Sequence, residues 1–255
     1  MIDFRTIFLI FGLVSIAGAF VTYLLWAEEG SKHNGLNWFL ISFTGQSVSL
    51  ILVFLRGYIP DLLSVVLMNF VTIFSVIAIL IGIKKFYNIA IVYWPLVLLL
   101  LVHVALQSWF TFGNPNLHYR NLIISISYLI VSFNILWVLI TSLGPEERRQ
   151  TSVIAFAFLL YCIIDAVRVF HYLSNNQVLD DYLKSGTFEL GVMLAYFFSY
   201  LLQLFGIITM VNRYFQFEMK LANEKFFKVF NHSQNAIILS RKSDGLIVEV
   251  NKGLE

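Results

Sequence analysis

Charged residues are scarce in this chain. Only 13% of its 255 residues are Asp, Glu, Lys or Arg, and its formal net charge is +2. Soluble domains carry about 25% charged residues and about 45–50% apolar ones, whereas hydrophobic residues make up 59% here. A net charge this small gives no support for nucleic-acid binding. The composition therefore predicts an integral membrane protein.

Other absences exclude particular sites and cofactors. Cys162 is the one cysteine in the sequence, so no disulfide can form within the chain and no cysteine metal cluster is possible. Residues 187–211, the last apolar stretch, contain no lysine, which excludes a retinal Schiff base there. The first apolar stretch is too long for a signal-peptide core and has no clear cleavage site after it, so we expect a retained first helix.

Seven apolar stretches are each long enough to cross a bilayer, which takes about 20 residues. Most connectors between them are short and contain turn or helix-breaking residues. The predicted fold class is an all-α integral membrane protein, a bundle of seven transmembrane helices over residues 1–211. The predicted spans are residues 7–26, 37–55, 62–83, 89–110, 121–142, 152–173 and 187–211.

The distribution of positive charge favours an N-terminus outside the membrane and a cytoplasmic C-terminus. In that orientation six cations flank the spans on the inside and four on the outside, and both adjacent pairs of cations fall inside. The inner cations are Lys32, Lys84, Lys85, Arg148, Arg149 and Arg213, and the outer ones are Arg5, Arg56, Arg120 and Lys184.

The composition changes after the seventh span. Residues 212–230 mix charged and apolar residues at helical spacing, and Tyr214, Phe217 and Leu221 repeat like a short coiled-coil seam. We expect the seventh helix to continue through them as a signalling helix. Two β-rich runs, "AIILS" and "LIVEV", follow with Asp244–Gly245 between them. This pattern predicts a hairpin, because glycine accepts the positive φ that the turn requires.

The end of the chain carries a family resemblance. The residues concerned are Phe226, Phe227 and Phe230 on the helix, Ala236, Ile237 and Ile238 on the first strand, Asp244–Gly245 at the turn, and Val250–Asn251 closing the second strand. Their order resembles the opening of a PAS domain. The resemblance implies an incomplete PAS domain over residues 231–255, and a two-stranded hairpin is marginal alone. We therefore expect this chain to be a fragment of a longer protein.

A second resemblance lies within residues 35–86. Its residues are Gly35, Leu36, Trp38, Leu55, Arg56, Gly57, Ile59, Pro60, Asp61, Leu63, Ser64, Asn69, Gly82 and Phe86. They look like the second and third helices of the sensor region found in bacterial proteins with GGDEF diguanylate cyclase output domains. The resemblance implies an inner-membrane receptor that controls cyclic di-GMP and is a homodimer at full length. The chain contains no GGDEF, EAL or histidine-kinase motif, so we expect no enzymatic activity in it.

Arg56 and Asp61 flank a tight turn between the second and third spans, in "RGYIPD". Pro60 suits the first turn of a helix, where its missing N–H costs nothing. Asp61 complements the positive end of the third helix, and Arg56 the negative end of the second. We expect a structural Arg56–Asp61 pair in preference to contact with a ligand.

Polar side chains concentrate in the predicted outer half of five spans. Asp165, Arg168 and His171 follow at three-residue intervals in the sixth span, and Glu189 lies near the start of the seventh. Ionisable groups are costly in hydrocarbon, so they mark cavities or pathways. We predict an outward-facing pocket for a small polar, anionic or amphiphilic ligand. The candidate ligand-binding residues are Arg168, His171, Glu189, His103, Gln107, Asn69 and Asp165.

The roles of these charges stay open. Asp165 and Arg168 could neutralise each other as an i,i+3 pair, or Asp165 could orient Arg168 toward a ligand carboxylate or phosphate. Glu189 could bind an amine or hold Arg168. His103 and His171 could ligate haem or a metal, but hydrogen-bonded histidines are commoner, so we predict no cofactor.

The leading functional hypothesis is a bacterial sensor whose ligand biases two helix packings and whose seventh helix carries the signal inward. The expected partners are that ligand, membrane lipids and a second copy of the chain. A small-molecule transporter is the alternative. It is less favoured, because the spans show no inverted repeat, no broken midplane helices and no polar series through the inner half. An intramembrane enzyme is disfavoured by the absence of HExxH and paired-aspartate motifs.

Overall fold

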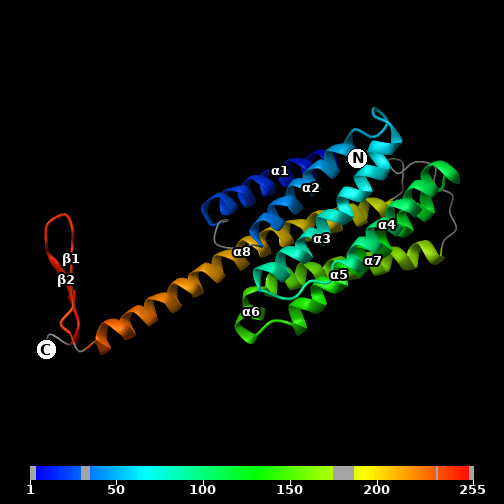
Figure 1. Ribbon diagram of the computed structural model, residues 1–255. Coiled ribbons are helices and arrows are strands. Elements are labelled where there is room, and N and C mark those ends of the chain that lie inside the picture. The colour runs from blue at the N-terminus through cyan, green and yellow to red at the C-terminus, as the bar shows by residue number, and fades with distance from the viewer. Residues whose placement is uncertain (1–3, 30–34, 175–186, 234, 253–255) are drawn as a thin grey trace. The chain divides into compact units, whose positions relative to one another are not determined.

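The computed structural model describes residues 4–29, 35–174, 187–233 and 235–252 (Figure 1). The connectors 30–34 and 175–186, which hold Lys32 and Lys184 of the orientation prediction, lie outside the described residues. Seven of the described helices are long and apolar enough to cross a membrane. This confirms the predicted number of spans, and we treat the chain as a multi-pass membrane protein.

The described part of the chain is almost entirely helical. Two π-helical segments, η1 and η2, continue directly into or out of neighbouring α-helices, so that η1 with α3 and α4 with η2 each form one span. The helices are α1 (Phe4–Glu29), α2 (Leu36–Phe54), η1 (Leu62–Leu67), α3 (Met68–Phe86), α4 (Trp94–Ser108), η2 (Trp109–Gly113), α5 (Leu117–Thr141), α6 (Pro145–Gln150), α7 (Ser152–Ser174) and α8 (Thr187–His232).

Two helix starts differ from the prediction. The fourth span begins at Trp94 and not at residue 89, with Pro95 in its first turn, where a proline is pre-organised for the helix. The fifth begins at Leu117 and not at residue 121, because Asn116 caps it: the Asn116 side-chain oxygen accepts a hydrogen bond from the Tyr119 amide at 3.2 Å. Arg120 therefore lies on a helix and not in a connector.

The stretch "GPEERRQ", predicted as a connector, contains the short helix α6. Its start is stabilised by a hydrogen bond of 2.8 Å from the Gly144 amide to the Glu147 carboxylate. Acidic residues lie in the first turn of α6 and basic residues in its last, which complements the helix dipole.

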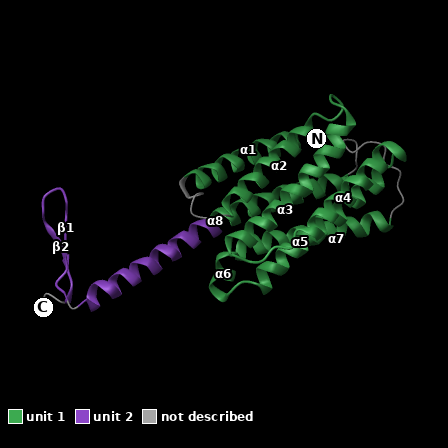
Figure 2. Cartoon of the chain, in the orientation of Figure 1, with its two compact units in different colours: residues 1–208 green, residues 209–255 purple. Residues whose placement is uncertain are grey.

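The chain divides into two units, residues 1–208 and residues 209–255 (Figure 2). The first unit is the helical bundle. The span that contains α3 is at its centre, because 67% of its most apolar stretch is buried, against 17% for the span that contains α4. In Figure 1, α3 lies between α2 and α5.

Glycine allows close helix packing where α2 begins and α3 ends. A Cβ atom added to Gly35 would lie 2.7 Å from the Gly82 carbonyl oxygen, and one added to Gly82 would lie 2.6 Å from the Phe39 ring. Apolar burial does not drive helix association inside a membrane, so contacts of this kind contribute much of the packing energy.

Hydroxyl groups also join helices within the bundle. The Ser15 and Ser47 side chains are 2.9 Å apart between α1 and α2, and the Tyr200 hydroxyl of α8 donates to Ser15 at 3.0 Å. Interhelical hydrogen bonds such as these are each worth about 0.6–2 kcal/mol in membrane proteins.

The second unit contains the rest of α8 and an antiparallel hairpin of β1 (Ile238–Ser240) and β2 (Ile247–Val250). The predicted turn is confirmed, since Gly245 has a φ of +71°. Asn251 joins the hairpin to the helix end. Its side chain donates to the Phe230 carbonyl at 3.0 Å and accepts from the Ile237 amide at 2.7 Å.

The close packing at Gly82 predicts that Gly82→Ala destabilises the bundle. Phe39 is fully buried and has no room to retreat, and overpacking of this kind costs about 1–3 kcal/mol. We expect a lower apparent unfolding temperature in detergent, measured by the fluorescence of the native tryptophans.

Gly12→Ala is the matched control, because the nearest atom to its added Cβ is 4.0 Å away on Leu50. Alanine has the higher helix propensity, so this variant should unfold at or above the wild-type temperature. Equal unfolding temperatures for the two variants would contradict the packing argument.

Candidate functional site

A cavity of about 170 Å³ lies inside the first unit. It is at the end of the bundle where α1, α5 and α8 begin and where α2 and α7 end, here called the N-terminal end. Its wall includes three arginines, Arg56, Arg120 and Arg168, together with tyrosine, amide and aliphatic side chains. No acidic side chain is among the described residues that line it.

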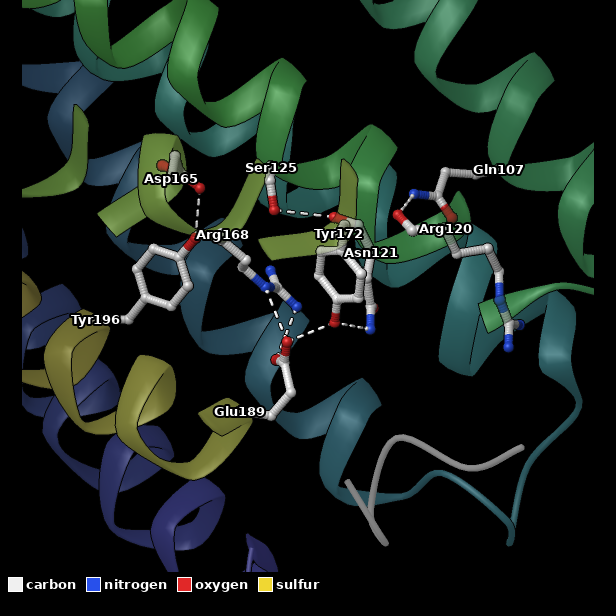
Figure 3. A network of polar contacts seen from close by, with 9 residues as sticks. All are labelled: Gln107, Arg120, Asn121, Ser125, Asp165, Arg168, Tyr172, Glu189 and Tyr196. Atoms are coloured by element: carbon white, nitrogen blue, oxygen red, sulfur yellow. Dashed lines mark hydrogen bonds and ion pairs between the residues drawn. The ribbon is translucent and has the colours of Figure 1, made fainter. Parts of the chain in front are cut away.

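A buried ion pair adjoins this cavity. Arg168 on α7 donates to both carboxylate oxygens of Glu189 on α8, from Nε at 3.2 Å and from Nη2 at 2.9 Å (Figure 3). Only 4% of Arg168 and 2% of Glu189 is exposed. A two-bond contact of this kind is strong and directional. It supports the predicted alternative in which Glu189 holds Arg168.

Tyr172 extends this contact to a third helix. Its hydroxyl donates to Glu189 and accepts a hydrogen bond of 2.7 Å from the Asn121 amide on α5. Arg168 also lies over the Tyr172 ring, with Cζ 5.7 Å from the ring centre. The network of Asn121, Arg168, Tyr172 and Glu189, here called the arginine network, therefore joins α5, α7 and α8.

The hydrogen-bond partner of Asp165 is not Arg168, the partner that the sequence analysis considered first. Its carboxylate accepts a hydrogen bond from the Tyr196 hydroxyl of α8 (Figure 3), and its second oxygen has no hydrogen-bond partner among the described residues. The carboxylate that holds Arg168 is Glu189, on the neighbouring helix. Asp165 therefore joins α7 to α8 through Tyr196.

Two further predicted residues form a second chain of hydrogen bonds. The Asn69 amide of α3 donates to the Gln107 side chain of α4 at 3.3 Å. Gln107 in turn donates to the Arg120 carbonyl of α5 at 3.0 Å (Figure 3). Asn69 also lines the cavity, whereas Gln107 lies behind the wall. Asn69 and Gln107, two of the residues predicted for the outer half of the bundle, therefore contact each other at its N-terminal end.

The two histidines lie away from the cavity wall. The Nδ1 atom of His103 is 2.8 Å from the Ser127 hydroxyl, and the His171 ring stacks on Phe188 with ring centres 3.8 Å apart. Neither residue lines the cavity. Within the described ranges, no group of three His, Cys, Asp or Glu side chains is placed to hold a metal ion.

The predicted Arg56–Asp61 ion pair is not formed, although the structure describes both residues. Arg56 is half-buried and lines the cavity, while Asp61 is exposed. An ion pair with an exposed carboxylate stabilises little, because water screens it. Both residues interact electrostatically with Arg120. Arg56 is thus a wall residue, and the sequence interpretation had given it a purely structural role.

Three tyrosines that the sequence analysis did not single out form one face of the cavity. The ring centres of Tyr128, Tyr161 and Tyr196 are 5.5–6.0 Å apart. The spacing on α7 offered a signal, since Tyr161, Asp165, Arg168 and Tyr172 recur at intervals of four, three and four residues and are all buried on one face. For Asn121 and Tyr196, the sequence showed no comparable spacing of polar residues.

No protein family, curated protein or solved structure matches this chain. The cavity, its three arginines and the arginine network are therefore the basis of the functional proposal below.

The arginine network predicts strong coupling between Arg168 and Glu189. Removing one partner of a buried ion pair costs about 3–5 kcal/mol, because the other charge stays buried. We expect Arg168→Gln and Glu189→Gln each to lower the free energy of unfolding in mixed micelles. The double variant should lose at least about 1 kcal/mol less than the sum of the single losses.

The control is a second double-mutant comparison, which combines Glu189→Gln with Arg149→Gln. Arg149 lies on the exposed surface of α6. These two substitutions should be additive, since distant sites do not couple. If the losses in free energy of unfolding from Arg168→Gln and Glu189→Gln also add up in their double variant, the ion pair is ruled out.

Proposed function

We propose that this chain is the membrane-embedded sensory input module of a bacterial signalling protein. The cavity at the N-terminal end binds a small polar, anionic or amphiphilic ligand. One observation carries this proposal: Arg168 lines the cavity and also holds Glu189 in the first turn of α8. A molecule in the cavity would therefore touch the residue that fixes the start of α8.

The ligand acts through a difference in affinity between two states of the bundle. A ligand shifts an equilibrium only to the extent that it binds one state better than the other. Contact with Arg168 changes how strongly the guanidinium holds Glu189 and, through Tyr172, Asn121 on α5. The arginine network is the element that the ligand biases.

The continuity of α8 supports a path for the signal. The helix runs without a break from Thr187, two residues before Glu189, to His232. In this proposal, a shift or rotation at its start is passed on through the hydrogen-bonded turns of this helix. Asn251 binds the carbonyl of Phe230, near the end of this helix, so the hairpin is joined directly to α8.

The resemblances described above agree with this function. In this proposal the hairpin of β1 and β2 is the start of a PAS domain, and residues 35–86, which resemble the sensor region of GGDEF proteins, are part of the ligand-sensing bundle. The receptor would lie in the bacterial inner membrane with its N-terminus outside, as the charge distribution favours. An output domain, a diguanylate cyclase in this proposal, would belong to the rest of the protein, and the full receptor would be a homodimer.

The proposal predicts that filling part of the cavity weakens ligand binding. Leu50 lines the cavity, so Leu50→Trp should fill part of it. Purified protein in lipid nanodiscs would be screened by thermal shift against small carboxylates, phosphate, amines and amino acids. A compound that binds the wild type should lose at least about tenfold in affinity with Leu50→Trp, and should change hydrogen exchange along residues 187–232.

Ile51→Trp is the matched control, since Ile51 is the next residue on α2 and is 44% exposed on the bundle surface. This variant should bind like the wild type. Binding that survives Leu50→Trp would place the site elsewhere. The protein would be a transporter instead if hydrogen exchange in α8 were the same with and without the ligand and proteoliposomes took up the same compound.

A further inference from the structure

The charge of the cavity wall narrows the class of ligand. Of the three arginines, Arg168 is neutralised by Glu189. Arg56 and Arg120 form no ion pair with any described residue, and each acts electrostatically on the other. Asp61 also acts on Arg120 but is exposed, so water weakens its effect. The guanidinium groups of Arg56 and Arg120, which are both half-buried, therefore lie at a cavity whose described wall contains no carboxylate.

Arg120 also has an unmet hydrogen-bond donor. Its Nε atom is buried and has no hydrogen-bond partner among the described residues. A buried donor without a partner is costly, and the cost is larger for a charged group. An anion held between Arg56 and Arg120 would satisfy this donor and relieve the repulsion between the two guanidinium groups. An amine would add to that repulsion.

Most of the remaining wall is aromatic and aliphatic, and its polar side chains are Gln46, Ser49, Asn69, Thr72 and Asn121. The Tyr128, Tyr161 and Tyr196 rings form one face, and Phe11 packs against Tyr200 with ring centres 5.0 Å apart. These side chains offer a compact apolar body the contacts that aromatic rings favour. Inorganic phosphate would leave a strongly hydrated ion against that face, with a large desolvation cost. The wall suits a molecule with one acidic group and one apolar part.

The size of the cavity limits that apolar part. Its volume of about 170 Å³ is close to that of an engineered cavity of about 150 Å³ that holds one benzene molecule. A single ring or a short branched chain with a carboxylate fits such a space. A long acyl chain would extend beyond this space.

We infer that the cavity binds a compact organic carboxylate, whose acid group lies between Arg56 and Arg120 and whose apolar body lies against Tyr128, Tyr161 and Tyr196. This inference rests on the proposed function, since it names the ligand class of the same cavity. It adds a division of roles. Arg56 and Arg120 recognise the anion, and Arg168, which lines the same cavity, contacts the bound molecule and links it to Glu189.

The test compares benzoate with benzamide, which has nearly the same shape and no charge. Binding would be measured by titration calorimetry on the whole chain in nanodiscs of zwitterionic phosphatidylcholine. Benzoate should bind at least tenfold more tightly than benzamide. Arg120→Gln and Arg56→Gln should each weaken benzoate binding about tenfold or more, because a hydrogen bond to a charged group is worth about 1.5–3 kcal/mol. Benzamide binding should barely change.

Arg149→Gln is the control variant, because it removes an exposed arginine at the other end of the bundle. It should leave both affinities unchanged, whereas equal loss in this variant would show only a general effect of charge. Equal binding of benzoate and benzamide, with both blocked by Leu50→Trp, would overturn the carboxylate assignment and leave the proposed cavity function standing.

Three further probes cover the other outcomes. Tighter binding of palmitate than of benzoate would identify a lipid acid and overturn the size argument. Tighter binding of inorganic phosphate would overturn the need for an apolar body. Failure of benzoate, palmitate, phosphate and the screened amines to bind would contradict the proposed function itself.

Discussion

The buried ion pair between Arg168 and Glu189 is the contact on which the N-terminal end of this bundle depends. Charges inside a membrane are stable only when paired and hydrogen-bonded, and this pair gains Tyr172 and Asn121 as additional partners. The arginine network therefore joins α5, α7 and α8 at the N-terminal end of the bundle. At the opposite end, Gly35 and Gly82 allow α2 and α3 to pack closely. The bundle is thus closely packed around Gly35 and Gly82, and it has a cavity at the end where Arg56, Arg120 and Arg168 lie.

This difference between the two ends supports the proposed function. Close glycine packing gives α3, the central helix, a fixed position. At the N-terminal end, long polar side chains reach one another around a cavity and leave room for a small molecule. Arg168 belongs to both the cavity wall and the arginine network, so the same guanidinium is available to a ligand and to α8. Under the proposed function, this shared guanidinium couples the ligand site to α8, because coupling needs contacts that differ between two states.

The sequence was sufficient for the coarse fold, because few backbone arrangements are possible in a bilayer. Each span must satisfy its own backbone hydrogen bonds, so an apolar stretch of the right length forms a helix. The hairpin was equally predictable from Asp244–Gly245. The start of α5 was missed because one side chain, Asn116, caps the helix four residues earlier than the apolar pattern suggests.

The site was predicted only in part, for a physical reason. Arg168, Glu189 and Asn69 were found because polarity within an apolar stretch is visible in one segment at a time. Which carboxylate holds Arg168, and where Arg56 points, depends on how distant segments pack, and periodicity carries no such information. His103 and His171 had the same local signal as Arg168, yet lie away from the cavity wall.

The most direct test is a distance between a ligand and an arginine in the bilayer. Solid-state NMR of the chain with ¹⁵N-labelled arginine side chains, bound to benzoate labelled with ¹³C at its carboxylate, measures that distance. The account predicts dipolar coupling that corresponds to a separation of about 4 Å, the reach of a charge-assisted hydrogen bond, and its loss in Arg120→Gln. Bound benzoate with no coupling to any arginine nitrogen would contradict the assignment of this cavity as an anion-binding sensor site.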